Sequence, residues 1–144
     1  MIPRVGEPVI AGMRYRPRPG AYAILMRRGQ VLLTHQSRPE PEFQLPGGGI
    51  DKGEQVIPAL HREVFEETGW RVSGLKRLGA YRRFSYMPEY DLWAEKVCHV
   101  FIGRPTFALS GPTEPHHEAV WANIPTAVEL LAGDGDRLFL SDFL

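Results

Sequence analysis

Short apolar runs separated by segments rich in glycine and proline dominate the hydrophobic pattern of this chain. The runs of strand-forming residues predict strands at 21–27, 31–35, 72–78, 80–84, 94–102 and 120–121. Arg28-Gly29-Gln30 lies between the first two runs and predicts a hairpin. Glycine and proline predict loops at 36–43 and 103–117, and Leu-Pro-Gly-Gly-Gly at 45–49 is not expected to form a regular element.

One longer stretch, residues 54–69, has helical periodicity. Pro58 is tolerated only in a first turn, so the helix is expected to begin near Gln55 or Val56, and Gly69 is a natural end. At about 100° per residue, the stripe expected to face the core consists of Ile57, Leu60, Val64 and Thr68. Two further helices are predicted at 125–132 and 136–143. This order predicts one α/β (α+β) domain with a mixed sheet covered by helices, preceded by an irregular Arg- and Pro-rich arm at 1–19.

Composition excludes several classes of protein. The chain has 144 residues, of which 43% are hydrophobic and 24% charged, a balance that excludes disorder. No apolar run approaches the ~20 residues that cross a bilayer, so no membrane partner is expected. Cys98 is the single cysteine, which excludes an intrachain disulfide and favours the cytoplasm. The formal net charge is zero, which argues against a general polyanion-binding surface such as one for DNA.

Three glutamates gather on one face of the predicted central helix. Glu63, Glu66 and Glu67 stand at i, i+3 and i+4, and the small Ala59 lies within the same stripe. Their mutual repulsion costs ~0.2–0.5 kcal/mol per pair, and the C-terminal end of a helix disfavours anions. Such a face is either solvated and partly neutralised by Arg62 or built to hold a cation. Carboxylate oxygens alone would select Mg²⁺ or Mn²⁺ over zinc.

The residues upstream of these glutamates decide between the two interpretations. The run Gly48-x5-Glu54-x7-Arg62-Glu63-Val64-x-Glu66-Glu67-x-Gly69-Trp70 resembles the Nudix box, G-x5-E-x7-R-E-U-x-E-E-x-G-U, where U is a bulky apolar residue. Trp70 is the one soft departure, because Ile, Leu or Val is usual there. The lead-in 45–50 and Gly53 also match the family. The resemblance implies a single Nudix domain over 1–144, an α/β/α sandwich with a mixed sheet and the box loop and helix at its centre.

The resemblance also implies an activity and a set of roles. Nudix enzymes hydrolyse a nucleoside diphosphate linked to another group X, giving a nucleoside monophosphate and phosphorylated X, with Mg²⁺ or Mn²⁺ as cofactor. The residues implied as metal ligands are Glu63, Glu66, Glu67 and the carbonyl of Gly47, and one of the glutamates serves as the base for water. Arg62 would orient the glutamates, and Glu54 would tie the loop to the helix. A further acid is expected from a loop outside the box, with Glu118 favoured over Glu114, and His116 and His117 are expected to be solvated.

The substrate remains open at this point. Arg83, Phe84 and Tyr86 are candidates for substrate binding, because arginine can clamp a phosphate and an aromatic ring can stack on a base. Tyr86, sixteen positions after Trp70, loosely fits a dinucleoside-polyphosphate pattern, whereas Pro88 is displaced from the ADP-ribose pattern. Nucleotide sugars and damaged deoxynucleoside triphosphates stay open.

Two alternative functions for this chain belong to other classes of protein. One is a Nudix-fold binding or regulatory module without catalysis, which normally lacks box glutamates that this chain retains. The other is an RNA 5′-end pyrophosphohydrolase, which the zero net charge and the lack of a basic stripe count against. The expected partner is a small nucleotide, and the expected state is a monomer or a homodimer.

Overall fold

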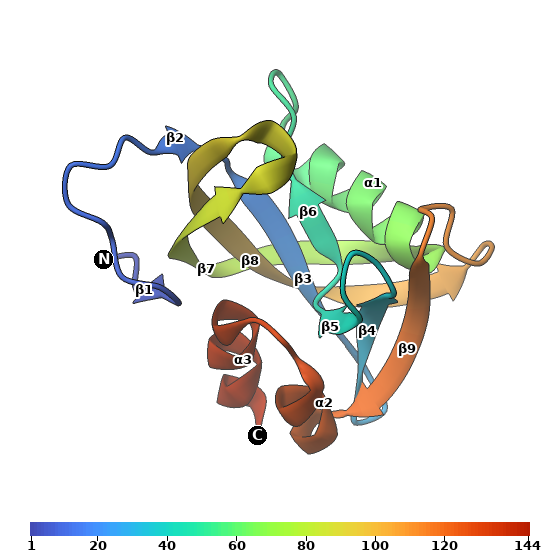
Figure 1. Ribbon diagram of the computed structural model, residues 1–144. Helices are drawn as coiled ribbons and strands as arrows, with labels where there is room; N and C mark the ends of the chain where they lie inside the picture. Colours follow the sequence, from blue (N-terminus) through green and yellow to red (C-terminus); the bar gives the residue numbers. More distant parts are fainter.

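Helices cover both faces of a mixed β-sheet in the computed structural model, which describes residues 1–144 (Figure 1). The strands are β1 (Arg4–Val5), β2 (Arg16–Pro17), β3 (Gly20–Arg27), β4 (Gln30–Gln36), β5 (Glu42–Gln44), β6 (Gly47–Gly49), β7 (Trp70–Met87), β8 (Leu92–Ala108) and β9 (His117–Asn123). The helices are α1 (Val56–Thr68), α2 (Ile124–Leu130) and α3 (Asp134–Leu140), with short 3₁₀ turns at Pro88–Tyr90 and Ser141–Phe143. None of these helices is long and apolar enough to span a membrane.

The sheet runs in the order β1-β7-β8-β3-β4-β5, with β2 paired to β8, β6 to β3 and β9 to β4. The predicted hairpin at residues 28–30 is confirmed, and Arg28 and Gly29 both have positive φ there. The two strands predicted at 72–78 and 80–84 are one strand, β7, interrupted only by irregular register. The loop predicted at 103–117 begins too early, because residues 103–108 continue β8 by pairing with the first residues of β7.

Two cores lie on opposite faces of the central strands. Side chains alternate along β3 and β4, because successive residues of a strand point to opposite faces. Ile24, Val31 and Leu33 pack with residues of α2 and α3, and Leu25 and Leu32 pack with α1. This layering confirms the expected α/β/α sandwich.

Two sequence expectations fail locally. Ile57 is 38% exposed, and Val56 packs against the core in its place, so the buried stripe of α1 runs through Val56, Leu60 and Val64. The arm at 1–19 is not wholly irregular, because its two short strands pair with the long β7–β8 hairpin. Both deviations follow from contacts with distant strands, which a local pattern does not contain.

The Gly47–Gly49 segment, which was not expected to be regular, forms β6 against β3. Gly47 has φ +148°, and a Cβ there would lie 2.1 Å from the carbonyl oxygen of Ala21. Only glycine can bring the backbone this close to β3. The three glycines therefore pair with β3 at a distance that a side chain on Gly47 would prevent.

A loop closes the C-terminal end of α1. Gly69 has φ +76° and donates its N–H to the carbonyl of Phe65 at 2.8 Å. The N–H groups of Thr113 and Glu114 both donate to the carbonyl of Glu66 at 2.8 Å. A Cβ on Gly69 would lie 2.0 Å from the carbonyl oxygen of Ser110, so this loop packs directly on the helix end.

Asp136 joins α3 to the sheet through a buried carboxylate. Its two oxygens accept hydrogen bonds from the backbone N–H of Leu45 at 3.1 Å and from the hydroxyl of Tyr81 at 3.2 Å. Burial raises the pKa of Asp136 to about 6, and these two donors oppose the shift without cancelling it.

We expect Asp136→Asn to become more stable relative to the parent protein as pH rises. The pKa of Asp136 in the folded protein lies above the unfolded value of about 3.9, so the folded protein binds more protons between these two pH values. The contribution of Asp136 to the free energy of unfolding therefore falls by about 3 kcal/mol from pH 4 to pH 7. Asparagine keeps an acceptor and does not ionise. Urea unfolding of both proteins at pH 4.5 and 7.5 measures the difference. This account would be contradicted if the two proteins differed in free energy of unfolding by the same amount at both pH values. It would also be contradicted if the exposed control Asp134→Asn showed the same dependence on pH.

Candidate active site on helix α1

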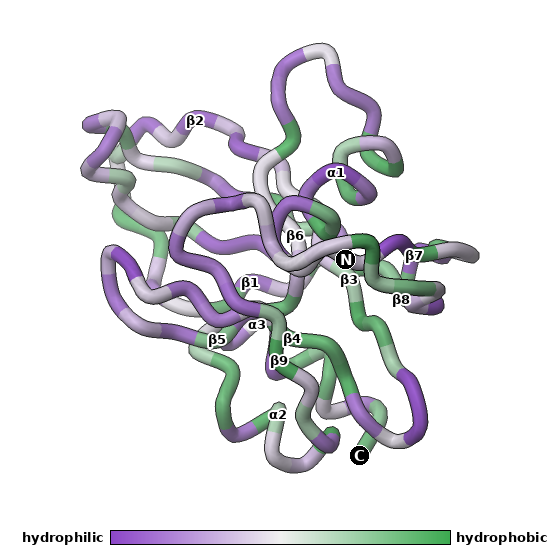
Figure 2. Tube along the Cα trace, turned by 90° about the vertical axis from the view of Figure 1, so that its right-hand side faces the viewer, coloured by the Kyte–Doolittle hydropathy of each residue, from purple (hydrophilic) through white to green (hydrophobic).

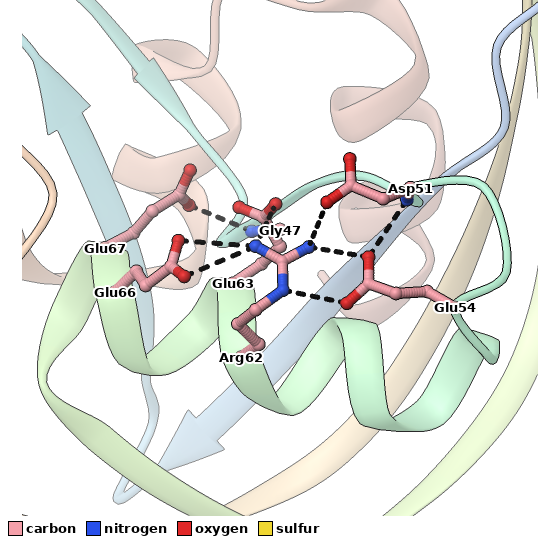
Figure 3. Close-up of polar contacts among 7 residues, drawn as sticks. All are labelled: Gly47, Asp51, Glu54, Arg62, Glu63, Glu66 and Glu67. Carbon is pink, nitrogen blue, oxygen red and sulfur yellow. Dashed lines mark hydrogen bonds and ion pairs between the residues drawn. The ribbon is translucent and has the colours of Figure 1, made fainter.

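Arg62 lies at the centre of the polar contacts along α1 (Figure 3). Its Nε and Nη2 each donate to Glu54 at 2.8 Å, and its Nη1 donates to Glu63 at 3.0 Å and to Glu66 at 3.3 Å. Hydrogen bonds from Arg62 lower the pKa of Glu54, which also accepts the N–H of Asp51 at 2.9 Å. One guanidinium thus ties the loop before α1 to two carboxylates on the helix, and Glu54 makes the link expected of it.

Glu67 is the most buried carboxylate of this face, with 6% of its surface exposed. Its Oε1 accepts the backbone N–H of Gly47 at 3.0 Å. The pKa of Glu67 is raised to about 8. Burial is the main cause, and the nearby negative charges of Glu63 and Glu114 also contribute. Burial also raises the pKa of Glu63. The acidic face is therefore desolvated, which excludes the interpretation as a solvated surface.

Gly48 leaves room for the carboxylate of Glu63. A Cβ at this position would lie 2.7 Å from Oε2 of Glu63, closer than real Cβ atoms come to other atoms. A side chain on the first glycine of the box would therefore displace the Glu63 carboxylate from its position beside β6. The neighbouring Gly47 presents its N–H to Glu67, and the role of its carbonyl as a metal ligand stays a prediction.

The donor set suits a hard cation in its chemistry. Three carboxylates lie on one face, and burial raises the pKa of two of them, so a divalent cation would relieve a like-charge cluster in a poorly solvated place. No three Asp, Glu, His or Cys side chains are placed to hold one ion in this structure. The reason is visible in Figure 3, where Glu63 and Glu66 turn toward Arg62 while Glu67 turns toward Gly47.

The structure favours Glu114, not Glu118, as the acid outside the box. Glu118 is exposed on β9 opposite His35. Glu114 is held at the end of α1 by its hydrogen bond to the carbonyl of Glu66, and its charge raises the pKa of both Glu63 and Glu67. No local signal distinguishes the two residues, because the return of the loop onto α1 depends on where β7 and β8 stop pairing.

His117 is not the solvated histidine expected from the sequence. Its Nδ1 lies 2.8 Å from the hydroxyl oxygen of the fully buried Thr34, and burial lowers its pKa. His116 beside it is exposed and has φ +66°, and its carbonyl accepts the N–H of Ser37. The pair fastens the loop to β4 and has no contact that suggests chemistry.

A cavity of about 580 Å³ lies on the side of the sheet that carries α3, and none of the box glutamates lines it. Residues from the arm, the sheet and α3 line it, among them Glu7, Tyr22, Gln44, Arg83, Lys96 and Asp136. Tyr22 lines the cavity and pairs in β3 with Gly47 of β6, whose N–H donates to Glu67 on α1. The sequence did not predict most of the residues that line this cavity, because they come from six separate segments of the chain.

Of the three residues assigned to substrate binding, only Arg83 lines this cavity. Phe84 is buried against Tyr15, with ring centroids 4.8 Å apart, and Tyr86 packs on Trp93 and donates its hydroxyl to Asp91. Neighbours along β7 point to opposite faces, so Arg83 and Phe84 cannot share one site. The structure therefore places Phe84 and Tyr86 outside the cavity.

Solved structures with the same architecture cover nearly all of the chain. A NUDIX hydrolase from Nitrosomonas europaea matches with a TM-score of 0.72 and 19% identity, covering 89% of this chain and 88% of that one. A MutT NUDIX hydrolase from Burkholderia pseudomallei matches with a TM-score of 0.71 and 23% identity, covering 90% and 99%. At these identities the likeness establishes the fold.

Curated relatives match shorter stretches. A putative 8-oxo-dGTP diphosphatase of Bacillus subtilis is 34% identical over 74 residues, which are 51% of this chain and 50% of that protein. An RNA pyrophosphohydrolase of Mesorhizobium japonicum is 45% identical over 65 residues, 40% of this chain and 37% of that protein. The matched regions thus span about half or less of these two relatives. The NUDIX domain model matches residues 15–143, which include every residue of the box and the strands and helices around it, and the chain therefore belongs to the NUDIX domain family.

Proposed function

We propose that the protein is a metal-dependent pyrophosphohydrolase that cleaves a nucleoside diphosphate linked to a group X into a nucleoside monophosphate and phosphorylated X. The observation that carries the proposal is the desolvated carboxylate face of α1, packed against the glycine strand β6. The relatives named as a diphosphatase and as pyrophosphohydrolases support the same reaction class.

Each group at the site has a task in this reaction. A divalent cation held by Glu63, Glu66 and Glu67, with the Gly47 carbonyl as a further ligand, would supply charge neutralisation and lower the pKa of the attacking water. Arg62 keeps Glu63 and Glu66 on one side of the helix through its fork of hydrogen bonds. One of the three glutamates serves as the base for the water. Glu114 adds a fourth carboxylate from the loop at the helix end.

The cavity is suited to the nucleoside part of the substrate. Asp136 and Gln44 offer hydrogen-bonding groups for a base or a ribose, and Arg83 and Lys96 offer cations for phosphate oxygens. The candidates for X remain a nucleotide sugar, a second nucleotide, ADP-ribose or the phosphate of a damaged deoxynucleotide. The unpaired Cys98 is buried, which fits a reducing compartment such as the cytoplasm.

A non-catalytic binding module is the second candidate, and the structure counts against it. All three glutamates are present, and the Glu63 carboxylate occupies the space that a side chain at Gly48 would fill. A module that only binds a ligand has no need to maintain three repelling carboxylates at the end of a helix.

Hydrolysis should require a divalent cation and release a nucleoside monophosphate. We expect ADP-ribose, nucleotide sugars, dinucleoside polyphosphates and damaged deoxynucleotides, tested as a panel, to be cleaved only with Mg²⁺ or Mn²⁺, and excess EDTA to stop the reaction. Phosphorus NMR identifies the products. Full activity without metal would refute the ligand assignment, and orthophosphate as the first product would refute attack on the pyrophosphate.

Glu67→Gln should lower activity without lowering stability. The amide oxygen can still accept the N–H of Gly47, but the negative charge is lost, so we expect kcat at saturating Mg²⁺ to fall by roughly 10²-fold, which corresponds to ~3 kcal/mol. At pH 9 in EDTA, above the pKa of about 8 at which Glu67 ionises, the melting temperature should stay equal or rise, because a buried charge and its repulsion are removed. The exposed Glu129→Gln is the matched control for both measurements. A Glu67→Gln protein with parental kcat would remove this residue from the catalytic set.

Glu114→Gln and Glu118→Gln should separate the two candidate loop acids. We expect the Glu114 variant to lose about 10-fold in kcat or in apparent metal affinity, because its charge acts on Glu63 and Glu67, whereas the Glu118 variant keeps parental values. Initial rates over a Mg²⁺ titration measure both quantities. The reverse result would restore the preference drawn from the sequence.

A further inference from the structure

The first residues of the arm form part of the wall of the cavity beside α3. Val5, Gly6 and Glu7 line this cavity together with residues 132–136, which lead into α3, and strands of the sheet supply the other lining residues. Val5 packs against the same core cluster as α3, and Figure 1 shows β1 on the side of the sheet that carries this helix. A ligand in the cavity would therefore contact both the arm and the sheet.

Few contacts hold this part of the arm, residues Pro3–Glu7, which we call the strap. Its strand β1 pairs with β7 at only two positions. The N–H of Arg82 in β7 donates to the carbonyl of Pro3 at 2.8 Å. Val5 is half-buried and is the only strap residue that packs against a core, whereas the other four are exposed. The position of the strap thus depends on one short strand pair and one apolar side chain.

The end of the arm next to the domain is held much more firmly. Tyr15 packs on two aromatic rings of the β7–β8 hairpin, with centroid distances of 4.8 Å to Phe84 and 6.3 Å to Trp93. Three residues later, the N–H of Arg18 donates to the carbonyl of Glu95 at 2.9 Å. Movement of the strap would therefore leave the arm attached to the sheet from Tyr15 onward.

An exposed connection joins the strap to this anchor. Figure 1 shows it as a loop that stands away from the sheet, and Figure 2 shows that the chain around β2, where it ends, is hydrophilic. Its hydrogen bonds lie within the arm: the N–H of Ile10 donates to the hydroxyl of Tyr15, and that of Met13 to the carbonyl of Ile10. Segments with few buried apolar contacts open at low free energy while the rest of the protein stays folded.

The closed strap also limits where Arg83 can lie. A Cβ on Gly6 would lie 3.6 Å from Cγ of Arg83, so the backbone of the strap runs against the aliphatic part of this side chain. Arg83 lines the cavity and takes part in none of the ion pairs of the structure. No carboxylate of the protein therefore fixes its guanidinium, and the strap is the neighbour that confines the side chain.

We propose that the strap opens to admit the nucleoside part of the substrate to the cavity, closes over it and positions Arg83 beside the bound nucleotide. The inference rests on the proposed function, which assigns this cavity to the nucleoside. A ligand that touches Val5–Glu7 only when the strap is closed stabilises the closed state, because its affinity for the two states differs. The strap precedes residues 15–143, the range that the family model matches.

Hydrogen exchange measured by NMR follows the strap through a single amide. The N–H of Arg82 is bonded to Pro3 and becomes free when the strap opens, whereas the N–H of Arg18, bonded to Glu95, is the internal control. After correction for intrinsic rates, we expect the Arg82 amide to exchange at least about 10-fold faster than the Arg18 amide. AMP, CMP, GMP and UMP are then added separately, and at least one should slow exchange at Arg82 by about 10-fold without slowing Arg18 equally.

Val5→Asp tests the strap in the full chain, with Val9→Asp as the matched control. Val9 is an exposed valine of the same arm that does not line the cavity. Aspartate at position 5 cannot pack against the core, so the strap should stay open. We expect KM for a cleaved substrate to rise by about 10-fold with kcat nearly unchanged, and the nucleotide to lose its effect on exchange at Arg82. The control variant should keep parental values.

The remaining outcomes separate the strap from the proposed function. Equal exchange of the two amides in the free protein, equal slowing of both by every nucleotide, or equal KM values for the two variants would overturn the strap. If substrates are still cleaved in that case, the proposed function stands. Selective slowing at Arg82 in a protein that hydrolyses none of the substrates would instead support the strap and refute the proposed function.

Discussion

The close packing of Gly47–Gly49 between β3 and α1 is the constraint on which the site depends. On one side a Cβ at Gly47 would collide with the backbone of Ala21, and on the other a Cβ at Gly48 would collide with Glu63. The absence of side chains lets the backbone of β6 reach the helix, so that the N–H of Gly47 meets Glu67. That contact gives the most buried carboxylate its hydrogen bond, and the same Gly47 pairs in the sheet with Tyr22, which lines the cavity.

Charge is strongly segregated in a protein whose net charge is zero. On α1 a single guanidinium, that of Arg62, faces the carboxylates of Glu54, Glu63 and Glu66, so negative charge is in excess there. On the arm, by contrast, Arg14, Arg16 and Arg18 are exposed and take part in none of the ion pairs of the structure. The total charge of the chain predicted neither of these concentrations of charge.

Family membership and local roles are separate questions in this chain. The NUDIX model covers residues 15–143, and the sheet and helices match solved structures. Most of the arm precedes the matched range. Its segment Val5–Glu7 nevertheless forms part of the cavity wall. The wall therefore combines segments inside the matched range with one that precedes it. Substrate selection, which depends on such walls, can differ between proteins with one common fold.

The sequence by itself determined the elements whose geometry is local. The start and end of α1, the shared face of Glu63, Glu66 and Glu67, and the hairpin at Arg28-Gly29 all follow from neighbours a few residues apart, and the structure agrees with each. Only the tertiary structure decided which surfaces meet. It put Val56 and not Ile57 in the core, brought Glu114 and not Glu118 to the end of α1, turned Phe84 away from Arg83, and paired Arg16 with Ala94. These outcomes depend on strand register and on the return of distant loops, and a shift of one residue in a strand moves every side chain to the opposite face.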